Sequence, residues 1–134
     1  MKKILVCEDS PTLSNVLRQT LSAAGYGVMT VDNGNAALIM ARSESPDLIL
    51  LDVMLPQVDG MRVCRMLKFD EKYKHIPIVM FTAKAGEADQ RLGMEVGADA
   101  YIPKSIGPEQ LLATVARLIS VGPRPGASAD QGAE

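Results

Sequence analysis

Short apolar runs alternate with amphipathic segments of helix length along most of this chain, and no other feature constrains the fold as strongly. The runs are rich in Val, Ile and Leu and show no polar alternation, as in strands buried on both faces of a sheet. They are Ile4–Val6, Val28–Val31, Leu48–Leu51, Ile78–Phe81 and Ala100–Ile102. Strands that alternate with helices pair in parallel, so we expect an α/β fold with a five-stranded parallel sheet covered on both faces.

The segments between the runs carry signals for the starts and ends of five helices. Ser10 followed by Pro11 marks the start of the first helix, and Gly25 its end. Asn33 is a candidate N-cap for the second, which must end before Pro46. The other three are expected over Gly60–Phe69, Glu87–Glu95 and a stretch from Leu111 to Ile119.

The length and composition fit one domain followed by a short tail. The chain has 134 residues, of which 47% are hydrophobic, enough for a single core. Beyond the fifth helix the sequence is rich in Gly and Pro and almost free of apolar side chains. We therefore expect a domain over residues 1–120 and a disordered tail over residues 121–134, which is either a native C-terminus or a linker to a further domain.

Charge and cysteine content argue against nucleic-acid binding, a cysteine metal site and a disulfide framework. The formal net charge of −2 gives no basic footprint, so direct nucleic-acid binding is not expected. Cys7 and Cys64 match neither a metal-binding spacing nor a disulfide framework and are interpreted as reduced thiols. We expect the carboxylates of Glu8 and Asp9 to disfavour the Cys7 thiolate.

Nothing in the sequence predicts insertion into a membrane. The apolar run after Lys2 and Lys3 is cut short by Glu8 and Asp9, so it does not make a signal peptide. No apolar stretch is long enough to span a bilayer. We expect a cytoplasmic protein.

Charged and hydroxyl side chains follow four of the predicted strands. Glu8 and Asp9 follow the first strand, Asp52 the third, Thr82 the fourth, and Lys104 comes shortly after the fifth. In open parallel sheets ligands bind beyond the carboxyl ends of the strands. Carboxylates gathered there repel one another unless a cation intervenes, and magnesium, which prefers oxygen ligands, meets that need.

Four motifs together resemble the receiver domain of two-component response regulators, over about Lys2 to Ile119. They are Cys7-Glu8-Asp9-Ser10, Leu50-Leu51-Asp52-Val53-Met54-Leu55-Pro56 with Asp59-Gly60, Phe81-Thr82-Ala83, and Gly97-Ala98-Asp99-Ala100-Tyr101-Ile102-Pro103-Lys104. The resemblance implies a flavodoxin-like, doubly wound sheet with strand order 2-1-3-4-5 and five helices.

The resemblance also implies which residues hold a metal. Asp52 matches the phosphoacceptor, Glu8 and Asp9 match the acidic pair, and the backbone carbonyl of Met54 matches a further metal ligand. The implied cofactor is Mg²⁺, for which Mn²⁺ can substitute.

Further matching residues have implied roles in phosphoryl transfer and switching. Thr82, Ala83 and Lys104 match the groups that bind the phosphoryl group, and Thr82 and Lys104 act with Asp52 in the transfer. Thr82 and Tyr101 match the switch pair, in which the aromatic side chain turns inward on activation.

The implied partners are proteins. The phosphodonor is a sensor histidine kinase or a phosphotransfer protein, or a small acyl phosphate. The output passes to an unidentified downstream protein through the fourth helix, fifth strand and fifth helix, from a monomer or a phosphorylation-dependent dimer. The chain is then a signalling switch, not an enzyme with a separate substrate.

Two positions depart from the usual family pattern. Pro103 precedes Lys104 and Ser105 follows it, where family members usually have a proline directly after the lysine. A cis bond before serine would cost about 2.5 to 4 kcal/mol, so we expect a trans Lys104–Ser105 bond, a rearranged loop and a Lys104 farther from Asp52. Glu8 stands where aspartate is more frequent.

Other classes of protein fit the residues less well. An aspartate-nucleophile phosphatase typically needs a second aspartate where this chain has Met54. A flavodoxin would meet repulsion between its cofactor phosphate and Glu8 and Asp9. A nucleotide hydrolase would need a Gly-rich loop with lysine, and a pseudo-receiver would not need the complete acceptor set.

The methionines are predicted to pack in the core and not to form an adaptable binding surface. They are Met29, Met40, Met54, Met61, Met66, Met80 and Met94.

Overall fold

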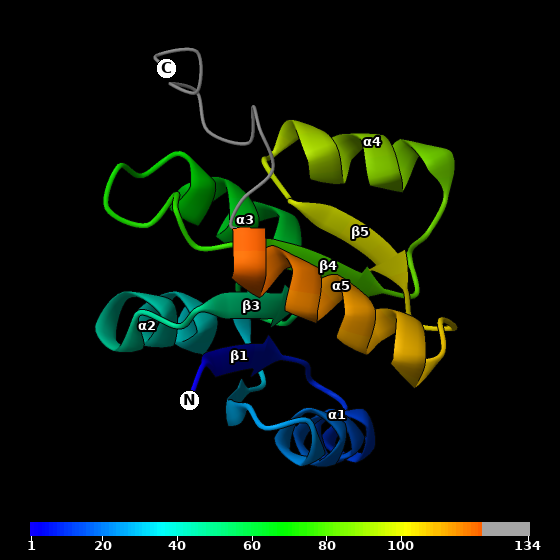
Figure 1. Ribbon diagram of the computed structural model, residues 1–134. Coiled ribbons are helices and arrows are strands. Elements are labelled where there is room, and N and C mark those ends of the chain that lie inside the picture. The colour runs from blue at the N-terminus through cyan, green and yellow to red at the C-terminus, as the bar shows by residue number, and fades with distance from the viewer. Residues whose placement is uncertain (122–134) are drawn as a thin grey trace.

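A computed structural model describes residues 1–121, which form a three-layer α/β fold (Figure 1). The strands are β1 (Lys3–Cys7), β2 (Gly27–Val31), β3 (Leu48–Leu51), β4 (Ile78–Thr82) and β5 (Ala100–Pro103). The helices are α1 (Pro11–Ala23), α2 (Gly34–Glu44), α3 (Gly60–Lys68), α4 (Glu87–Glu95) and α5 (Pro108–Val121). All strand pairs are parallel and the strand order is β2-β1-β3-β4-β5, so the predicted topology is confirmed.

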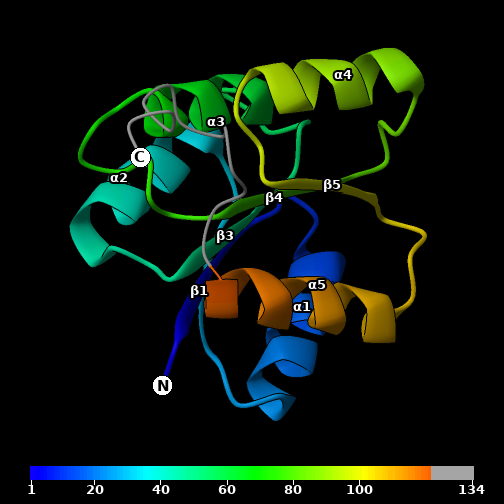
Figure 2. The same ribbon diagram turned by 45° about the horizontal axis from the view of Figure 1, so that its top comes forward.

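Helices cover both faces of the sheet. Figure 2 shows α2, α3 and α4 on one face and α1 and α5 on the other. Two clusters of buried apolar side chains fill the spaces, one between the sheet and α2, α3 and α4, the other between the sheet and α1 and α5. The expectation that every strand is buried on both faces holds for β1, β3 and β4 and is wrong for β2 and β5. These two lie at the edges of the sheet and are only half-buried.

The predicted helix signals lie where the helices begin and end. The Ser10 side chain accepts a hydrogen bond from the backbone N–H of Leu13, with Pro11 at the first helical position. The Asn33 side chain caps α2 in the same way. Gly25, just past the end of α1, has a φ of +100°, which disfavours a residue with a Cβ atom.

Gly60 allows the loop after β3 to close tightly over that strand. A Cβ atom at this position would lie 2.0 Å from the backbone carbonyl oxygen of Asp52, so only glycine fits. The Gly60 N–H also donates to the Val53 carbonyl at 2.8 Å. This packing fixes the backbone that carries Asp52.

Several features differ from the sequence predictions. The fifth helix extends to Val121, and the predicted tail beyond it lies outside the described residues. Met54, Met66 and Met94 are exposed, so for them the prediction of core packing is wrong. Among residues 1–121, no helix combines the length and apolar character needed to cross a bilayer.

Candidate functional site

The carboxyl ends of β1 and β3 bring two buried carboxylates side by side. Cys7 and Leu51, the last residues of these strands, are register partners, and the Asp52 N–H donates to the Cys7 carbonyl at 3.1 Å. The next residues, Glu8 and Asp52, are therefore neighbours, and both side chains are buried. Asp9 is exposed at the rim, and one carboxylate oxygen from each of the three acids lies within 4.8 Å of the others.

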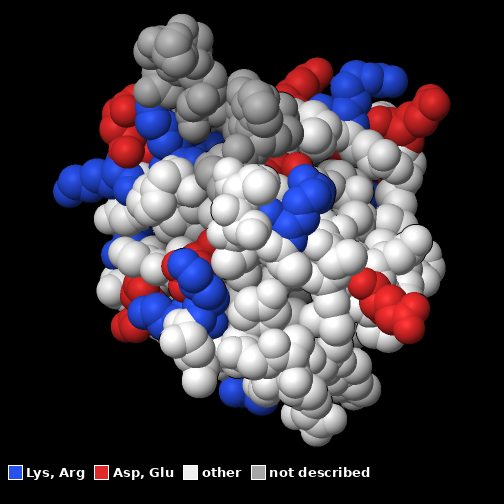
Figure 3. Space-filling model, viewed as in Figure 1, with Lys and Arg blue, Asp and Glu red and all other residues white. Residues whose placement is uncertain are grey.

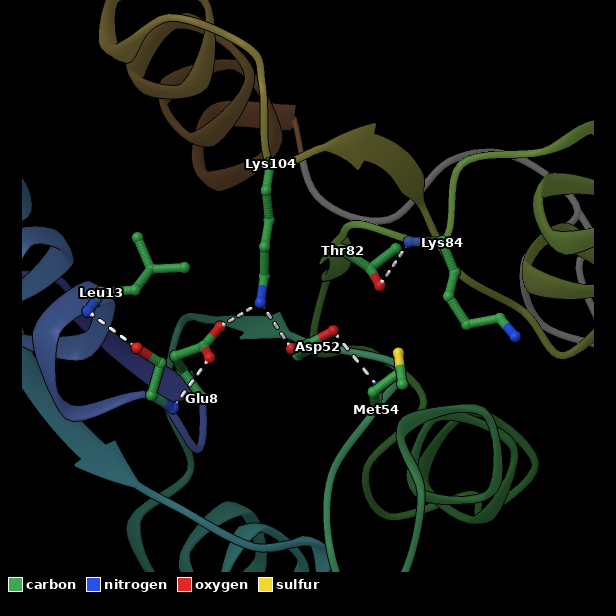
Figure 4. A network of polar contacts seen from close by, with 8 residues as sticks. Glu8, Leu13, Asp52, Met54, Thr82, Lys84 and Lys104 are labelled. Atoms are coloured by element: carbon green, nitrogen blue, oxygen red, sulfur yellow. Dashed lines mark hydrogen bonds and ion pairs between the residues drawn. The ribbon is translucent and has the colours of Figure 1, made fainter.

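Lys104 lies between the two buried carboxylates (Figure 4). Its Nζ is 2.7 Å from Asp52 Oδ2 and 2.9 Å from Glu8 Oε1. The peptide bond to Ser105 is trans, as predicted. The expectation that Lys104 would lie farther from Asp52 is wrong, because the trans loop still lets the long side chain reach the site. The Lys104 N–H donates to the Thr82 carbonyl at 3.0 Å, which anchors the loop to β4.

The environment of Lys104 favours its charged form. Burial would by itself lower the pKa of the ammonium group, but the hydrogen bonds and charges of Asp52 and Glu8 outweigh it and raise the pKa above its ordinary value. Lys104 is therefore a permanent cation at neutral pH.

The remaining oxygens of the buried carboxylates accept hydrogen bonds from the backbone. Asp52 Oδ1 accepts from the Met54 N–H at 3.2 Å, and Glu8 Oε2 accepts from the Ser10 N–H at 3.0 Å. These bonds fix the orientation of both groups without a second cation. The cluster thus contains three carboxylates and one lysine, which contacts two of them, so an excess of negative charge remains at the rim where Asp9 lies.

The end of β4 holds the hydroxyl of Thr82 next to Asp52, as Figure 4 shows. Thr82 is fully buried, and its Oγ1 accepts a hydrogen bond from the Lys84 N–H at 3.2 Å. The Lys84 carbonyl in turn accepts a hydrogen bond from the Tyr101 hydroxyl. The backbone of Lys84 therefore links the hydroxyl at the site to the aromatic side chain on β5.

Tyr101 is half-buried and packs against α4. A Cβ atom at Gly93 would lie 2.5 Å from Cδ2 of the Tyr101 ring, so glycine allows this contact. Burial, followed by the charges of Asp89 and Asp52, raises the pKa of Tyr101. Its hydroxyl is a hydrogen-bond donor at neutral pH.

Two further predicted residues lie at the same edge of the sheet. Met54 has an exposed side chain, so only its backbone faces Asp52. Ala83 follows β4 directly and is exposed. All predicted site residues except Tyr101, which lies inside β5, thus come from the carboxyl ends of four strands or the residues just after them.

The thiolate form of Cys7 is disfavoured for a different reason from the predicted one. Its side chain is buried, and desolvation by burial raises the pKa of the thiol. The neighbouring carboxylates are not the cause.

Sequence reasoning did not find Lys84 or the contact between Lys104 and Glu8. Lys84 acts through its backbone N–H and carbonyl, which any residue type provides, so its position two residues after Thr82 is the only available signal. The contact with Glu8 depends on the reach of the lysine side chain across two strands.

The chain matches the family described as "Response regulator receiver domain" over residues 4–116. It is 43% identical over 118 residues to the alkaline phosphatase synthesis transcriptional regulatory protein PhoP of Bacillus subtilis, covering 88% of this chain and 48% of that protein. It is also 43% identical over 117 residues to the transcriptional regulatory protein BaeR of Escherichia coli, covering 87% and 48%. The chain thus spans about half the length of these curated relatives.

The fold also matches solved structures. The BeF3-activated N-terminal receiver domain of Klebsiella pneumoniae RstA superimposes with a TM-score of 0.81 at 33% identity, covering 88% of this chain and 98% of that one.

Proposed function

The chain belongs to the family of response regulator receiver domains, and from this premise we propose that Asp52 is its phosphoacceptor. The supporting observation is the setting of this carboxylate: it is buried at the end of β3, with Oδ2 against the Lys104 ammonium and Oδ1 on the Met54 N–H. Glu8 Oε1 also contacts the Lys104 ammonium.

Asp52 supplies the nucleophile for phosphoryl transfer. One carboxylate oxygen attacks the phosphorus of the donor and forms an O–P bond, while the bond from phosphorus to the leaving group breaks and its electron pair departs with that group. Lys104 neutralises charge that develops on the equatorial oxygens, and the Thr82 hydroxyl and the Ala83 N–H donate to them. The product is an acyl phosphate, whose hydrolysis resets the switch.

The acidic cluster fits a divalent cation. Glu8, Asp9 and Asp52 offer carboxylate oxygens within 4.8 Å of one another, and the Met54 carbonyl would complete the set of protein ligands. Oxygen donors with an excess of negative charge suit Mg²⁺, or Mn²⁺ in its place. When bound, the ion would supply positive charge at the transferring phosphoryl group. The Ser10 N–H and the Lys104 ammonium fix the orientation of the Glu8 carboxylate, and Asp9 offers its carboxylate at the rim.

The same geometry suggests how phosphorylation changes the surface. A phosphoryl group on Asp52 offers the Thr82 hydroxyl a new acceptor, so that Oγ1 leaves the Lys84 N–H. The Lys84 peptide, which also holds the Tyr101 hydroxyl, then shifts and carries β5 and α4 with it. Phosphorylation shifts the equilibrium between the inactive and active conformations only by the difference in free energy between the contacts that the phosphoryl group makes in each.

The partners follow from this chemistry. The donor is a phosphohistidine on a sensor kinase or a phosphotransfer protein, or a small acyl phosphate, and the output surface is α4, β5 and α5. The chain transforms no separate substrate. Acidic and basic side chains are interspersed on the face seen in Figure 3, which favours a protein over nucleic acid as the direct partner. Two buried thiols, Cys7 and Cys64, suit a reducing cytoplasm.

Intact-mass analysis tests this proposal. The wild type should gain the mass of one phosphoryl group from a small acyl phosphate when magnesium or manganese is present, and none in excess chelator. Asp52→Asn should gain nothing, while Asp47→Asn, at the opposite end of the sheet, should behave as the wild type. Equal gains in Asp52→Asn, or in chelator, would refute the assignment.

A further inference from the structure

The exposed large apolar side chains gather on one face of the molecule. In residues 1–121, all of them except Met1, Val16 and Val121 belong to α2, α3, α4 or the segments directly before and after α3. They are Ile39, Met54, Met66, Phe69, Leu92 and Met94. These three helices lie on the same side of the sheet (Figure 2). Methionine and phenylalanine are enriched in protein interfaces relative to other surfaces, so this outer face is suited to contact a protein.

The charges on this face are separated by sign. On α3 the exposed charges are Arg62 and Arg65, and the helix contains no acidic residue. The Arg65 guanidinium lies 5.3 Å from the centre of the exposed Phe69 ring, so the cation and the apolar group form one patch.

The neighbouring helix α4 carries the opposite sign. It has three acidic residues, Glu87, Asp89 and Glu95, and one basic residue, Arg91. Its apolar exposed residues are Leu92 and Met94. An acidic and apolar helix therefore lies beside a basic and apolar one.

The two helices are neighbours across a groove. The Cys64 thiol on α3 donates to the carbonyl of Val96, the residue that follows α4. Farther along, a groove of about 520 Å³ is lined by Met61 of α3 and Leu92 of α4, among other residues.

We propose that the outer face of α3 and α4 binds the same face of a second copy of this chain, in a twofold-symmetric dimer. A twofold axis that runs along the groove places α3 of each copy on α4 of the other. The arginines of each α3 then meet the glutamates of the facing α4, and Met66 and Leu92, which are exposed apolar residues of α3 and α4, are buried between the copies. Each copy thus pairs its basic helix with the acidic helix of the other, so opposite charges meet at two places. A partner protein whose surface carries only one sign of charge could match only one of the two helices.

This surface goes beyond the proposed function. It shares α4 with the proposed output surface, but it does not require β5, α5 or a phosphoryl group on Asp52. The dimer should therefore form in the unphosphorylated protein.

Sedimentation velocity over a range of concentrations tests the dimer. The wild type should associate at low salt and dissociate as salt increases, because the pairs are exposed at the rim. Arg62→Glu/Arg65→Glu and Glu87→Lys/Glu95→Lys should each weaken association about tenfold or more, since like charges then face each other. A charge reversal on α5, Arg117→Glu, should leave it unchanged.

An equimolar mixture of the two double variants provides the sharpest test. In a heterodimer the reversed α3 of one variant meets the reversed α4 of the other, so opposite charges face each other again. The mixture should therefore associate at least as well as the wild type, which also shows that both variants are folded. A wild type that remains monomeric at all concentrations would overturn the proposal. So would a monomeric mixture, or a loss of association in Arg117→Glu but not in the α3 and α4 variants.

Discussion

At the scale of single residues, Lys104 is the group on which the charge balance of the site depends. It contacts both buried carboxylates, and without it Glu8 and Asp52 would face each other with only backbone N–H groups as partners. Removing the ammonium should therefore destabilise the folded protein as well as slow phosphoryl uptake.

The contribution of Lys104 to the free energy of unfolding should decrease at high pH. Because its pKa is raised in the folded state above the ordinary value of 10.5, the folded protein holds this proton more tightly than the unfolded chain. The difference in free energy of unfolding between the wild type and Lys104→Met should be constant below the ordinary pKa of 10.5 and fall as pH rises further. Urea unfolding of both proteins from pH 7 to 11 measures it. A difference that grows above pH 10 would show that the lysine is not held as a cation.

The residue types and positions of the site were predictable because parallel strands end at one edge. Glu8, Asp52, Thr82 and Lys104 were identified from their places after consecutive strands, and the structure brings them together. Lys84 was not predictable, because hydrogen bonds from a backbone carry no signature in the side chain.

At the scale of elements, β5 and α4 connect the site to the surface. Tyr101 on β5 packs on Gly93 of α4, and its hydroxyl reaches the Lys84 carbonyl between β4 and α4. Glycine inside a helix costs about 1 kcal/mol relative to alanine, so α4 is weakened at the position where the aromatic ring needs room. Only Gly93 of α4 is buried, which fits an element that shifts.

Thr82→Ala should separate phosphorylation from its consequence. The variant keeps Asp52 and Lys104 and should still take up the phosphoryl group. It lacks the hydroxyl that accepts from the Lys84 N–H and that is proposed to move to the phosphoryl group. A coupling of about 1 to 3 kcal/mol, or 5- to 150-fold in partner affinity, should largely disappear.

Amide NMR with a beryllofluoride mimic of the phosphoryl group measures this coupling. Shifts around Arg91, Tyr101 and Leu111 should be large in the wild type and in the control Thr20→Ala, and small in Thr82→Ala. Shifts of equal size in all three, or absent from all three, would mean that the output uses another route.

At the scale of the whole molecule, a buried ion pair that no sequence pattern indicated ties the far end of the sheet together. Lys68 at the end of α3 donates to Asp99 at 3.0 Å and to the carbonyls of Lys74 and Ile76. Asp99 also accepts from the Ile78 N–H at 2.8 Å. A lysine in the last turn of an amphipathic helix is usually exposed, and only the tertiary contacts with Asp99, just before β5, and with the carbonyls that precede β4 explain its burial.

Lys68→Met should destabilise the fold strongly. Breaking a buried ion pair by removing one partner costs about 3 to 5 kcal/mol, because the other charge remains buried. The midpoint of denaturant unfolding should fall accordingly, while Lys72→Met, an exposed control in the following turn, should change little. A loss in Lys68→Met no larger than in the control would mean that the apolar part of the side chain, and not the charge, matters.

Most of the architecture could be predicted because its signals are local. Ser10, Asn33 and Gly25 define helix ends through their own side chains or conformations, and uninterrupted apolar runs identified the strands. The half-burial of β2 and β5 was not predictable from their composition, because a strand at the edge of a sheet can be as apolar as a central one.

The account as a whole depends on Asp52 as the residue that carries the phosphoryl group. Borohydride reduces an acyl phosphate to an alcohol and so marks the modified aspartate with a stable mass change. After incubation with a small acyl phosphate and magnesium, reduction and proteolysis, peptide mapping should find this change at Asp52 alone. Finding it at Asp9, or finding no converted aspartate although the intact protein has gained a phosphoryl group, would contradict the account.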